Sequence, residues 1–172
     1  MGISINDTLL DIIVNDMIQK TVEINNCACS AIISNPLSDY LKLADTYQKL
    51  KEGFHIRMIR KQQWQYIFLD ELQYDRIMLH ISEDTEVHQF IRCKLGPLVE
   101  YDRAHDTQLL ETLEALIQNH NSRKLAAESL FLHRNTMVHR INKIEEVLHC
   151  SLDDTEIMEQ LEFAIKMKMY AH

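Results

Sequence analysis

The stretch Leu125–Ile144, LAAESLFLHRNTMVHRINKI, has the pattern of two short helices separated by a tight turn. In its second half apolar residues recur at steps of four and three. At about 100° per residue, this spacing places them on one helix face. They are Met137, Ile141, Ile144 and, just beyond, Leu148. The opposite side carries Asn135, Val138, His139 and Asn142, with Arg134 and Arg140 toward the flanks and Lys143 between. A helix with an apolar anchor and an outward face of Arg, Asn and His suits the major groove. The pattern therefore predicts a helix-turn-helix DNA-binding motif.

The length and composition are typical of a globular protein. The chain has 172 residues, 46% hydrophobic and 26% charged, which allows one large domain or two small ones with a buried core. Only three Gly and two Pro occur, and this favours long helices with few tight turns. The longest apolar run, Leu9–Val14, is interrupted by Asp11 and is far shorter than the roughly 18 residues of a membrane span. We therefore expect no membrane segment, no signal peptide and a cytoplasmic protein.

Charge is unevenly distributed along the chain. The net charge of −8 is not that of a protein coated with basic residues for nucleic acid. Between Asn119 and Ile144, however, five basic residues stand against the single acid Glu128, a local balance of +4. Phosphate attraction is screened within about 8–10 Å at physiological salt, so the local sign matters more than the total. The cluster favours DNA binding, and a merely solvated helix face is the alternative.

The first part of the chain, residues 1–82, is predicted to be a small α+β segment with two strands. Asp7–Thr8 are expected to cap an amphipathic helix. The expected strands are Cys29–Ser34 and Trp64–Leu69, and a helix over Leu37–Glu52, ending at Gly53, is expected between them. Two strands are fewer than an independent sheet needs. We therefore expect this region to lean on the rest of the chain or on a second copy.

From Glu71 onward the sequence predicts only helices, so the fold class is mainly α, with residues 83–172 as the helix-turn-helix domain. The expected helices are Glu71–Ile81, Glu86–Leu95 before a break at Gly96–Pro97, one capped by Asp106, one capped by Asn121 or Ser122, one over 133–148 and one over 154–170. Ala126–Ala127 are small enough to let two helices approach closely, as a helix-turn-helix requires.

The sequence holds no pattern typical of a catalytic or metal site. The nine His are scattered, no Gly-rich phosphate loop occurs, and no Ser lies in a strand–turn–helix elbow. Cys27 and Cys29 lack a second Cys or His pair that would complete a zinc site. We therefore expect no enzyme activity, no cofactor and no metal, and we expect the four cysteines, which include Cys93 and Cys150, to be free structural thiols.

Three blocks of the second half carry a family resemblance. They are LVEYD leading into LLETLEAL (98–102 and 109–116), Ala126–Ala127–Leu130 followed by His133–Thr136 and Arg140–Ile141, and Ile144–Glu146 followed by Leu152–Asp153. Over roughly residues 95–170 they resemble the C-terminal DNA-binding domain of the PucR family, bacterial regulators of purine catabolism, sugar-diacid use and related pathways. The stretch SNPLSDYLKLADTYQKLKEG (34–53) is similar to the late part of the GGDEF-like domain that precedes it in such regulators. No GGDEF sequence occurs, so no cyclase chemistry is implied, and the chain is expected to be a truncated member or to start internally.

The resemblance places His133–Thr136 at the start of the recognition helix, where backbone N–H groups and the helix dipole favour a phosphate. Asn135 is suited to adenine and Arg134 to guanine or a phosphate. Thr136 is equally suited to a phosphate and to a local hydrogen bond, and Arg140 to DNA and to an acidic partner inside the domain. The full candidate DNA-binding set is Arg123, Lys124, His133, Arg134, Asn135, Thr136, Val138, His139, Arg140, Asn142 and Lys143, of which Arg123 and Lys124 are suited to backbone contacts.

Two features depart from a typical helix-turn-helix. The turn Phe131–Leu132 has no Gly, and a bulky residue with positive φ there is strained. Val138 contacts a thymine methyl group or is inert. The sequence as a whole predicts a homodimeric, sequence-specific transcriptional regulator that inserts helix 133–148 into the major groove of double-stranded DNA. The alternative, favoured by the acidic total charge, is a dimerisation or protein-interaction module without DNA binding. The residues identify no operator or effector.

Overall fold

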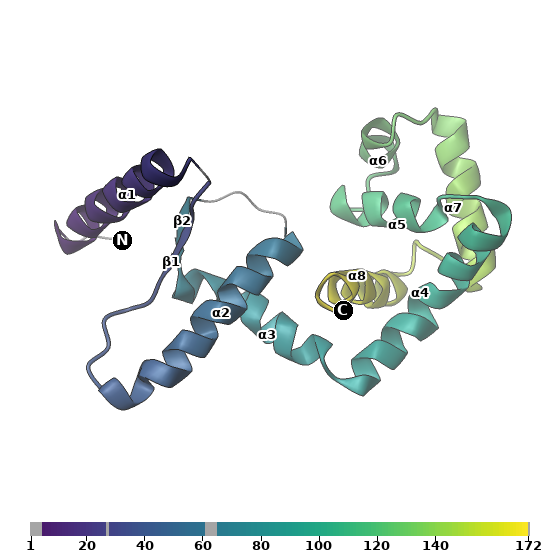
Figure 1. Ribbon diagram of the computed structural model, residues 1–172. Helices are drawn as coiled ribbons and strands as arrows, with labels where there is room; N and C mark the ends of the chain where they lie inside the picture. Colours follow the sequence, from purple (N-terminus) through teal and green to yellow (C-terminus); the bar gives the residue numbers. More distant parts are fainter. Residues whose placement is uncertain (1–4, 27, 61–64, 172) are drawn as a thin grey trace. The chain divides into compact units, whose positions relative to one another are not determined.

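The computed structural model describes residues 5–26, 28–60 and 65–171. Over these residues the chain forms eight α-helices and one two-stranded sheet, so the predicted mainly-α class is confirmed (Figure 1). The chain divides into two compact units, Met1–Leu79 and His80–His172. No helix of the described residues combines the length and the apolar character needed to cross a membrane.

The first unit is built around two short parallel strands, in which Ala31 pairs with Tyr66 and Ile33 with Phe68. In chain order it contains α1 (Ile5–Asn25), β1 (Ala31–Ile33), the 3-10 turn η1 (Tyr40–Lys42), α2 (Leu43–Arg60), β2 (Tyr66–Phe68), the 3-10 turn η2 (Leu69–Leu72) and most of α3 (Gln73–Ser82). Both strands lie where the sequence predicted them, although Trp64, the expected first residue of the second strand, lies outside the described residues.

Three helix ends predicted for this unit are wrong. The helix expected from Leu37 begins as α2 only at Leu43, after the turn η1. Asp7–Thr8 lie inside α1, which begins at Ile5, and α2 continues through Gly53 to Arg60. A Cβ at position 53 would lie 2.6 Å from Cδ1 of Ile32 and 3.0 Å from Cδ1 of Leu72. The missing side chain thus lets α2 approach the strand and the turn closely. This packing outweighs the roughly 1 kcal/mol by which glycine disfavours a helix.

The helix α1 has apolar residues on two sides. On one side Ile18 is buried and Leu10 and Val14 are half-buried, and the Tyr66 hydroxyl donates to the Asp11 carboxylate at 2.9 Å. Elsewhere on the helix, large apolar side chains remain exposed, namely Leu9, Ile12, Ile13, Met17 and Ile24. A helix that is apolar around most of its circumference is usually covered by other protein. The expectation that this region packs against the rest of the chain or against a second copy remains a prediction.

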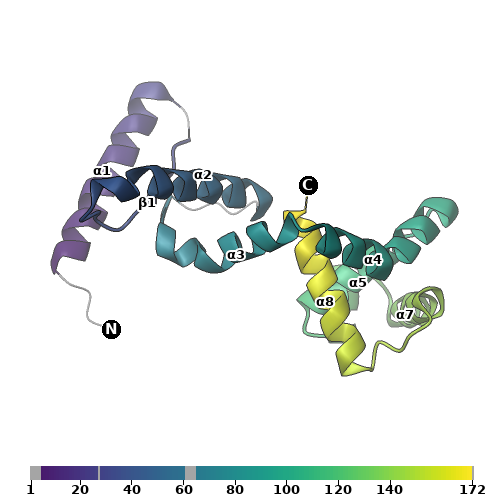
Figure 2. The same cartoon turned by 90° about the horizontal axis from the view of Figure 1, so that it is seen from below.

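The second unit is a set of five helices around one core. They are α4 (Thr85–His105), α5 (Leu109–Gln118), α6 (Arg123–Ser129), α7 (Arg134–Leu148) and α8 (Thr155–Tyr170). The helix α7 packs against α4, α5 and α6, and α8 packs against α4. Figure 2 shows α8 crossing α4. Each helix contributes at least one side chain with no more than 3% exposure, including Leu98, Leu113, Ala126, Ile141 and Ala164.

The predicted break at Gly96–Pro97 is wrong, because α4 runs without interruption from Thr85 to His105 with Pro97 inside it. Proline in a helix interior removes a backbone hydrogen bond and costs about 3 kcal/mol. Here Leu95 and Leu98, on either side, are 2% and 0% exposed. Their burial holds both halves of the helix against the same core, and this tertiary packing outweighs the local penalty.

The predicted cap of α5 is also wrong. Asp106 ends α4 in the left-handed conformation, with φ of 52°. The carboxylate that caps α5 is that of Asp102, which accepts hydrogen bonds from the Leu109 and Leu110 N–H groups at 2.7 and 2.9 Å. Partial burial acts to raise the pKa of the Asp102 carboxyl, but these bonds, the Thr107 hydroxyl and the Arg140 charge outweigh it and lower the pKa. Asp102 therefore holds the start of α5 as a carboxylate.

Candidate nucleic-acid interface

The helices α6 and α7 form a helix-turn-helix with the ends that the sequence predicted. The Ser122 hydroxyl caps α6 by accepting from the Leu125 N–H at 3.4 Å. His133 caps α7, and its Nδ1 accepts from the Asn135 N–H at 3.3 Å. Ala126 is 0% exposed and Ala127 is 6% exposed. These small side chains allow the close approach of helices expected from them.

The turn between the two helices contains a strained aromatic residue. Phe131 has φ of 55° and its side chain is 97% exposed. Its N–H donates to the Glu128 carbonyl at 3.1 Å, and the Leu132 N–H donates to the Ala127 carbonyl at 2.8 Å. This is a Schellman motif, in which a left-handed residue other than glycine costs about 1–2 kcal/mol. Phe131 occupies the position where many such turns have glycine.

The helix α7 has the two sides that its periodicity predicted. Met137, Ile141 and Ile144 are at most 1% exposed and belong to the core. The other side is open, with exposed side chains at Arg134, Asn135, Thr136, Val138, His139 and Asn142. Anchored by three buried residues, the helix presents this polar side to solvent as a rigid surface.

Arg140 lies between these two sides and contacts α5. Its Nη1 donates to the Thr112 hydroxyl at 3.1 Å, and its Nη2 donates to the Gln108 Oε1 at 3.3 Å. Thr112 is fully buried, and the Arg140 charge contributes to lowering the pKa of the Asp102 carboxyl. Of the two roles that the sequence left open, the structure supports an internal one. The hydrogen-bond acceptors are neutral oxygens, and the acidic neighbour acts only through its charge.

The Lys143 ammonium contacts two neighbouring side chains. Its ammonium lies 2.9 Å from the Glu146 carboxylate and 5.2 Å from the centre of the Tyr101 ring. The hydrogen bond to Glu146, more than any other contact, raises the pKa of the Lys143 ammonium. A DNA phosphate must compete with Glu146 for this side chain.

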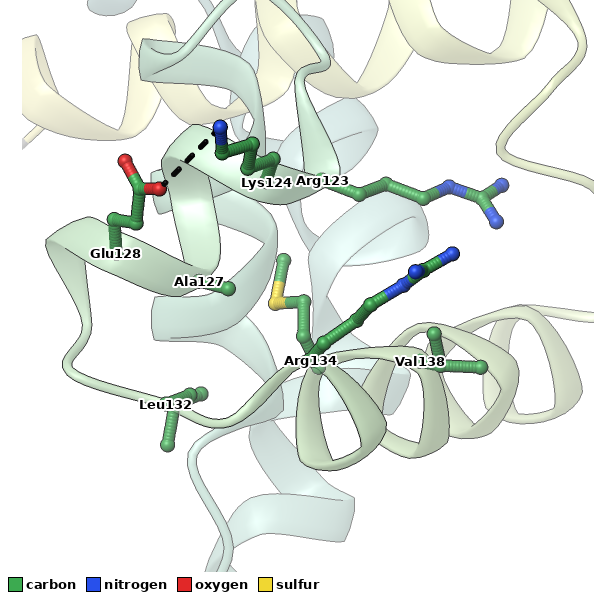
Figure 3. A pocket seen from close by; sticks show the side chains of 8 residues that line it. Arg123, Lys124, Ala127, Glu128, Leu132, Arg134 and Val138 are labelled. Atoms are coloured by element: carbon green, nitrogen blue, oxygen red, sulfur yellow. Dashed lines mark ion pairs between the residues drawn. The ribbon is translucent and has the colours of Figure 1, made fainter.

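A groove of about 620 Å³ lies between α6 and α7. Its lining includes the cations of Arg123, Lys124 and Arg134. Figure 3 shows the Arg123 and Arg134 side chains extending in the same direction, while Lys124 turns toward Glu128. The Lys124–Glu128 ion pair is 4.0 Å long, whereas Arg123 lies 2.7 Å from the Asp153 carboxylate. The Arg134 guanidinium makes no ion pair within the described part of the chain.

The cysteines and histidines form no cluster of metal-binding type among the residues that the structure places. No group of three or more His, Cys, Asp or Glu side chains there is placed to hold a metal ion. Cys29, Cys93 and Cys150 are free thiols, and burial raises the pKa of the Cys150 thiol. Cys27 lies outside the described residues.

Comparison with known proteins places this geometry in a family context. Residues 109–167 match the PucR C-terminal helix-turn-helix domain. The chain is 32% identical over 91 residues to the purine catabolism regulatory protein of Bacillus subtilis (strain 168), covering 53% of this chain and 17% of that protein. It is 31% identical over 133 residues to the proline-responsive transcriptional activator PutR of the same organism, covering 75% of this chain and 32% of PutR.

The chain thus spans about a third or less of these two relatives, and no solved structure matches it. The similarity of residues 34–53 to a GGDEF-like domain remains a prediction. The matched segment, in contrast, includes α5, α6, α7 and most of α8, which are the helices that build and support the polar surface described above. Residues 109–167 of this chain therefore contain a helix-turn-helix and are similar to the PucR C-terminal domain.

Proposed function

We propose that this chain is a sequence-specific DNA-binding transcriptional regulator that inserts α7 into the major groove of double-stranded DNA. The observation that carries the proposal is the division of α7 into a fully buried apolar side and an exposed side with Arg134, Asn135 and His139. This division suits a recognition helix, whose N-terminal side chains contact base edges. The match to a helix-turn-helix domain and two relatives named as regulators support the same function.

The proposed roles follow from position and chemistry. Asn135 reads adenine through its paired donor and acceptor, and Arg134 contacts guanine or a phosphate. His133 and Thr136 lie at the same end of α7, and Val138, His139 and Asn142 continue the exposed side. Arg123, Lys124 and Lys143 contact the DNA backbone, which positions the protein without reading sequence. Arg140 acts mainly as a positioning residue, because its guanidinium joins α7 to α5.

Arg134→Ala and Asn135→Ala are each expected to abolish the preference for a selected DNA site while leaving the fold intact, because both side chains are exposed. Each bidentate contact to a base contributes about 1–3 kcal/mol of discrimination. The site would first be selected from a random DNA library with the unaltered chain. Fluorescence anisotropy would then compare its affinity with that of scrambled DNA.

Arg92→Ala is the matched control for Arg134→Ala, because it removes the same charge from an exposed position on α4. We expect this variant to keep the site preference. Unchanged discrimination in both α7 variants would discard the assignment of base reading to this helix.

A second function, self-association through α1, is favoured by its uncovered apolar residues. Leu9, Ile12, Ile13, Met17 and Ile24 are between 47% and 80% exposed. A stable interface buries about 800 Å² on each partner, and an apolar helix side of this length is an appropriate centre for one. A second copy is the proposed occupant, because a single short recognition helix reads too few base pairs for useful specificity.

The double substitution Met17→Glu and Ile13→Glu is expected to convert a two-fold dimer into a monomer. Each new carboxylate would lose its hydration when buried in the apolar contact between two copies of α1. Sedimentation velocity would measure the change. Gln19→Glu, at an exposed polar position of the same helix, is the control and should remain dimeric. Sedimentation of the unaltered chain as a monomer, both free and on DNA, would contradict the dimer.

A further inference from the structure

The Arg123–Asp153 contact joins the groove between α6 and α7 to the loop that precedes α8. Arg123 is the first residue of α6, and Asp153 lies between α7 and α8. The Nη2 atom of Arg123 is 2.7 Å from Oδ1 of Asp153. The Arg123 and Arg134 side chains line the same groove and extend in the same direction (Figure 3). One arginine of this pair is therefore held by an internal carboxylate, while its neighbour makes no ion pair within the described residues.

The contact contributes little to the fold. The side chains of Arg123 and Asp153 are 44% and 80% exposed, and exposed ion pairs of this kind have small net stabilities. Other groups shape the loop. The Glu145 carboxylate accepts from the Leu152 N–H at 2.8 Å, and the Asp154 carboxylate caps α8 by accepting from the Glu156 N–H at 2.9 Å. The loop is thus held by groups other than the Asp153 side chain.

The same guanidinium atoms that hold a carboxylate also hold a phosphate, because both anions present oxygens to the planar N–H fork. We propose that Asp153 is an internal competitor for the DNA phosphate that Arg123 holds, so that loss of this carboxylate strengthens DNA binding. The inference rests on the proposed DNA-binding function. It names Asp153 as the residue that sets how tightly the groove holds a phosphate.

Two effects of the carboxylate act in the same direction. A phosphate that takes the Nη2 edge of the Arg123 guanidinium must first displace Asp153. The displaced carboxylate then remains near the bound phosphate, where the two negative charges repel each other. Because both side chains are exposed to solvent, at 44% and 80%, solvent screens these effects, and together they correspond to about a two- to tenfold change in affinity.

The experiment uses the full chain and the substitution Asp153→Asn, which removes the charge and keeps the shape. We expect the dissociation constant for double-stranded DNA of scrambled sequence to fall about two- to tenfold at 50 mM salt. Glu159→Gln, which removes the same charge from an exposed position of α8, is the matched control and should change the affinity much less. Fluorescence anisotropy measures all the variants.

A second pair of variants tests whether the gain acts through Arg123. In the Arg123→Ala background, Asp153→Asn is expected to give no gain, because the competed side chain is absent. An equal effect of Asp153→Asn and Glu159→Gln would overturn the competitor role, and so would a gain that persists without Arg123. In both cases the unaltered chain still binds DNA, so the proposed function stands. Failure of every variant to bind DNA at any salt concentration would overturn both.

Discussion

The affinity of the chain for double-stranded DNA is expected to fall by about 10³–10⁵ between 50 and 200 mM salt, for a dimer that contacts roughly 6–10 phosphates. Each contacted phosphate releases condensed counterions, and added salt opposes that release. The chain has a net charge of −8, so the attraction depends on the local cations of α6 and α7. Anisotropy titrations at several salt concentrations would give the slope of log affinity against log salt.

Two lysine variants test whether the cations of the groove between α6 and α7 cause this salt dependence. Lys124→Ala should reduce it by about one, because the Lys124 side chain is 84% exposed and its ion pair with Glu128 is long, at 4.0 Å. Lys168→Ala removes the same charge from α8, where Lys168 pairs with Glu114 at 3.0 Å, and should leave the slope unchanged. An affinity that hardly depends on salt would mean that the chain does not contact phosphates and would favour the protein-interaction alternative.

Ile141→Ala is expected to lower the free energy of unfolding by about 2–5 kcal/mol, because it leaves a cavity in a core that relaxes only partly. Ile141 is 0% exposed and lies in one cluster with Leu113 and Ile144. Urea denaturation followed by circular dichroism would measure the change as a shift in the midpoint at constant slope.

The adjacent residue provides the control. Asn142 is exposed on the same helix, so Asn142→Ala should change the free energy of unfolding by no more than about 0.5 kcal/mol. For DNA binding the expected order of the two variants is the opposite. At a temperature where both are folded, Asn142→Ala should weaken binding more than Ile141→Ala does. Equal destabilisation by the two substitutions would show that α7 does not have one buried side and one open side.

Elements with strong local signals were predictable. The bounds of α7 follow from apolar periodicity, and those of α8 lie within one residue of the expected 154–170. The cap Ser122 of α6 is one of the two polar residues that the sequence offered. The positive φ of Phe131 was a foreseeable strain, because the turn needs a left-handed residue and the sequence has no glycine there. All these features depend on residues within about one helical turn of each other.

Features that depend on distant partners were not predictable. Local rules end a helix at Gly53 or Pro97, yet α2 and α4 continue through them. At Gly53, α2 packs so closely on Ile32 and Leu72 that no side chain fits there. At Pro97, the core holds Leu95 and Leu98 on either side. A capping rule based on adjacent residues selects Asp106, whereas the carboxylate that reaches the α5 N–H groups comes from Asp102, seven residues before Leu109.

The polar surface of α7 likewise has some features that were predictable from the sequence and others that were not. The sequence alone determined which residues of α7 face outward, because a helix repeats every 3.6 residues whatever surrounds it. Only the tertiary structure decided which cations are engaged. It joins Arg140 to α5 and Arg123 to Asp153, whereas the Lys143–Glu146 pair lies within α7, three residues apart. Periodicity specifies direction around one helix, whereas an ion pair or a hydrogen bond between helices requires two chain segments within about 3 Å of each other, a distance that only the packed core sets.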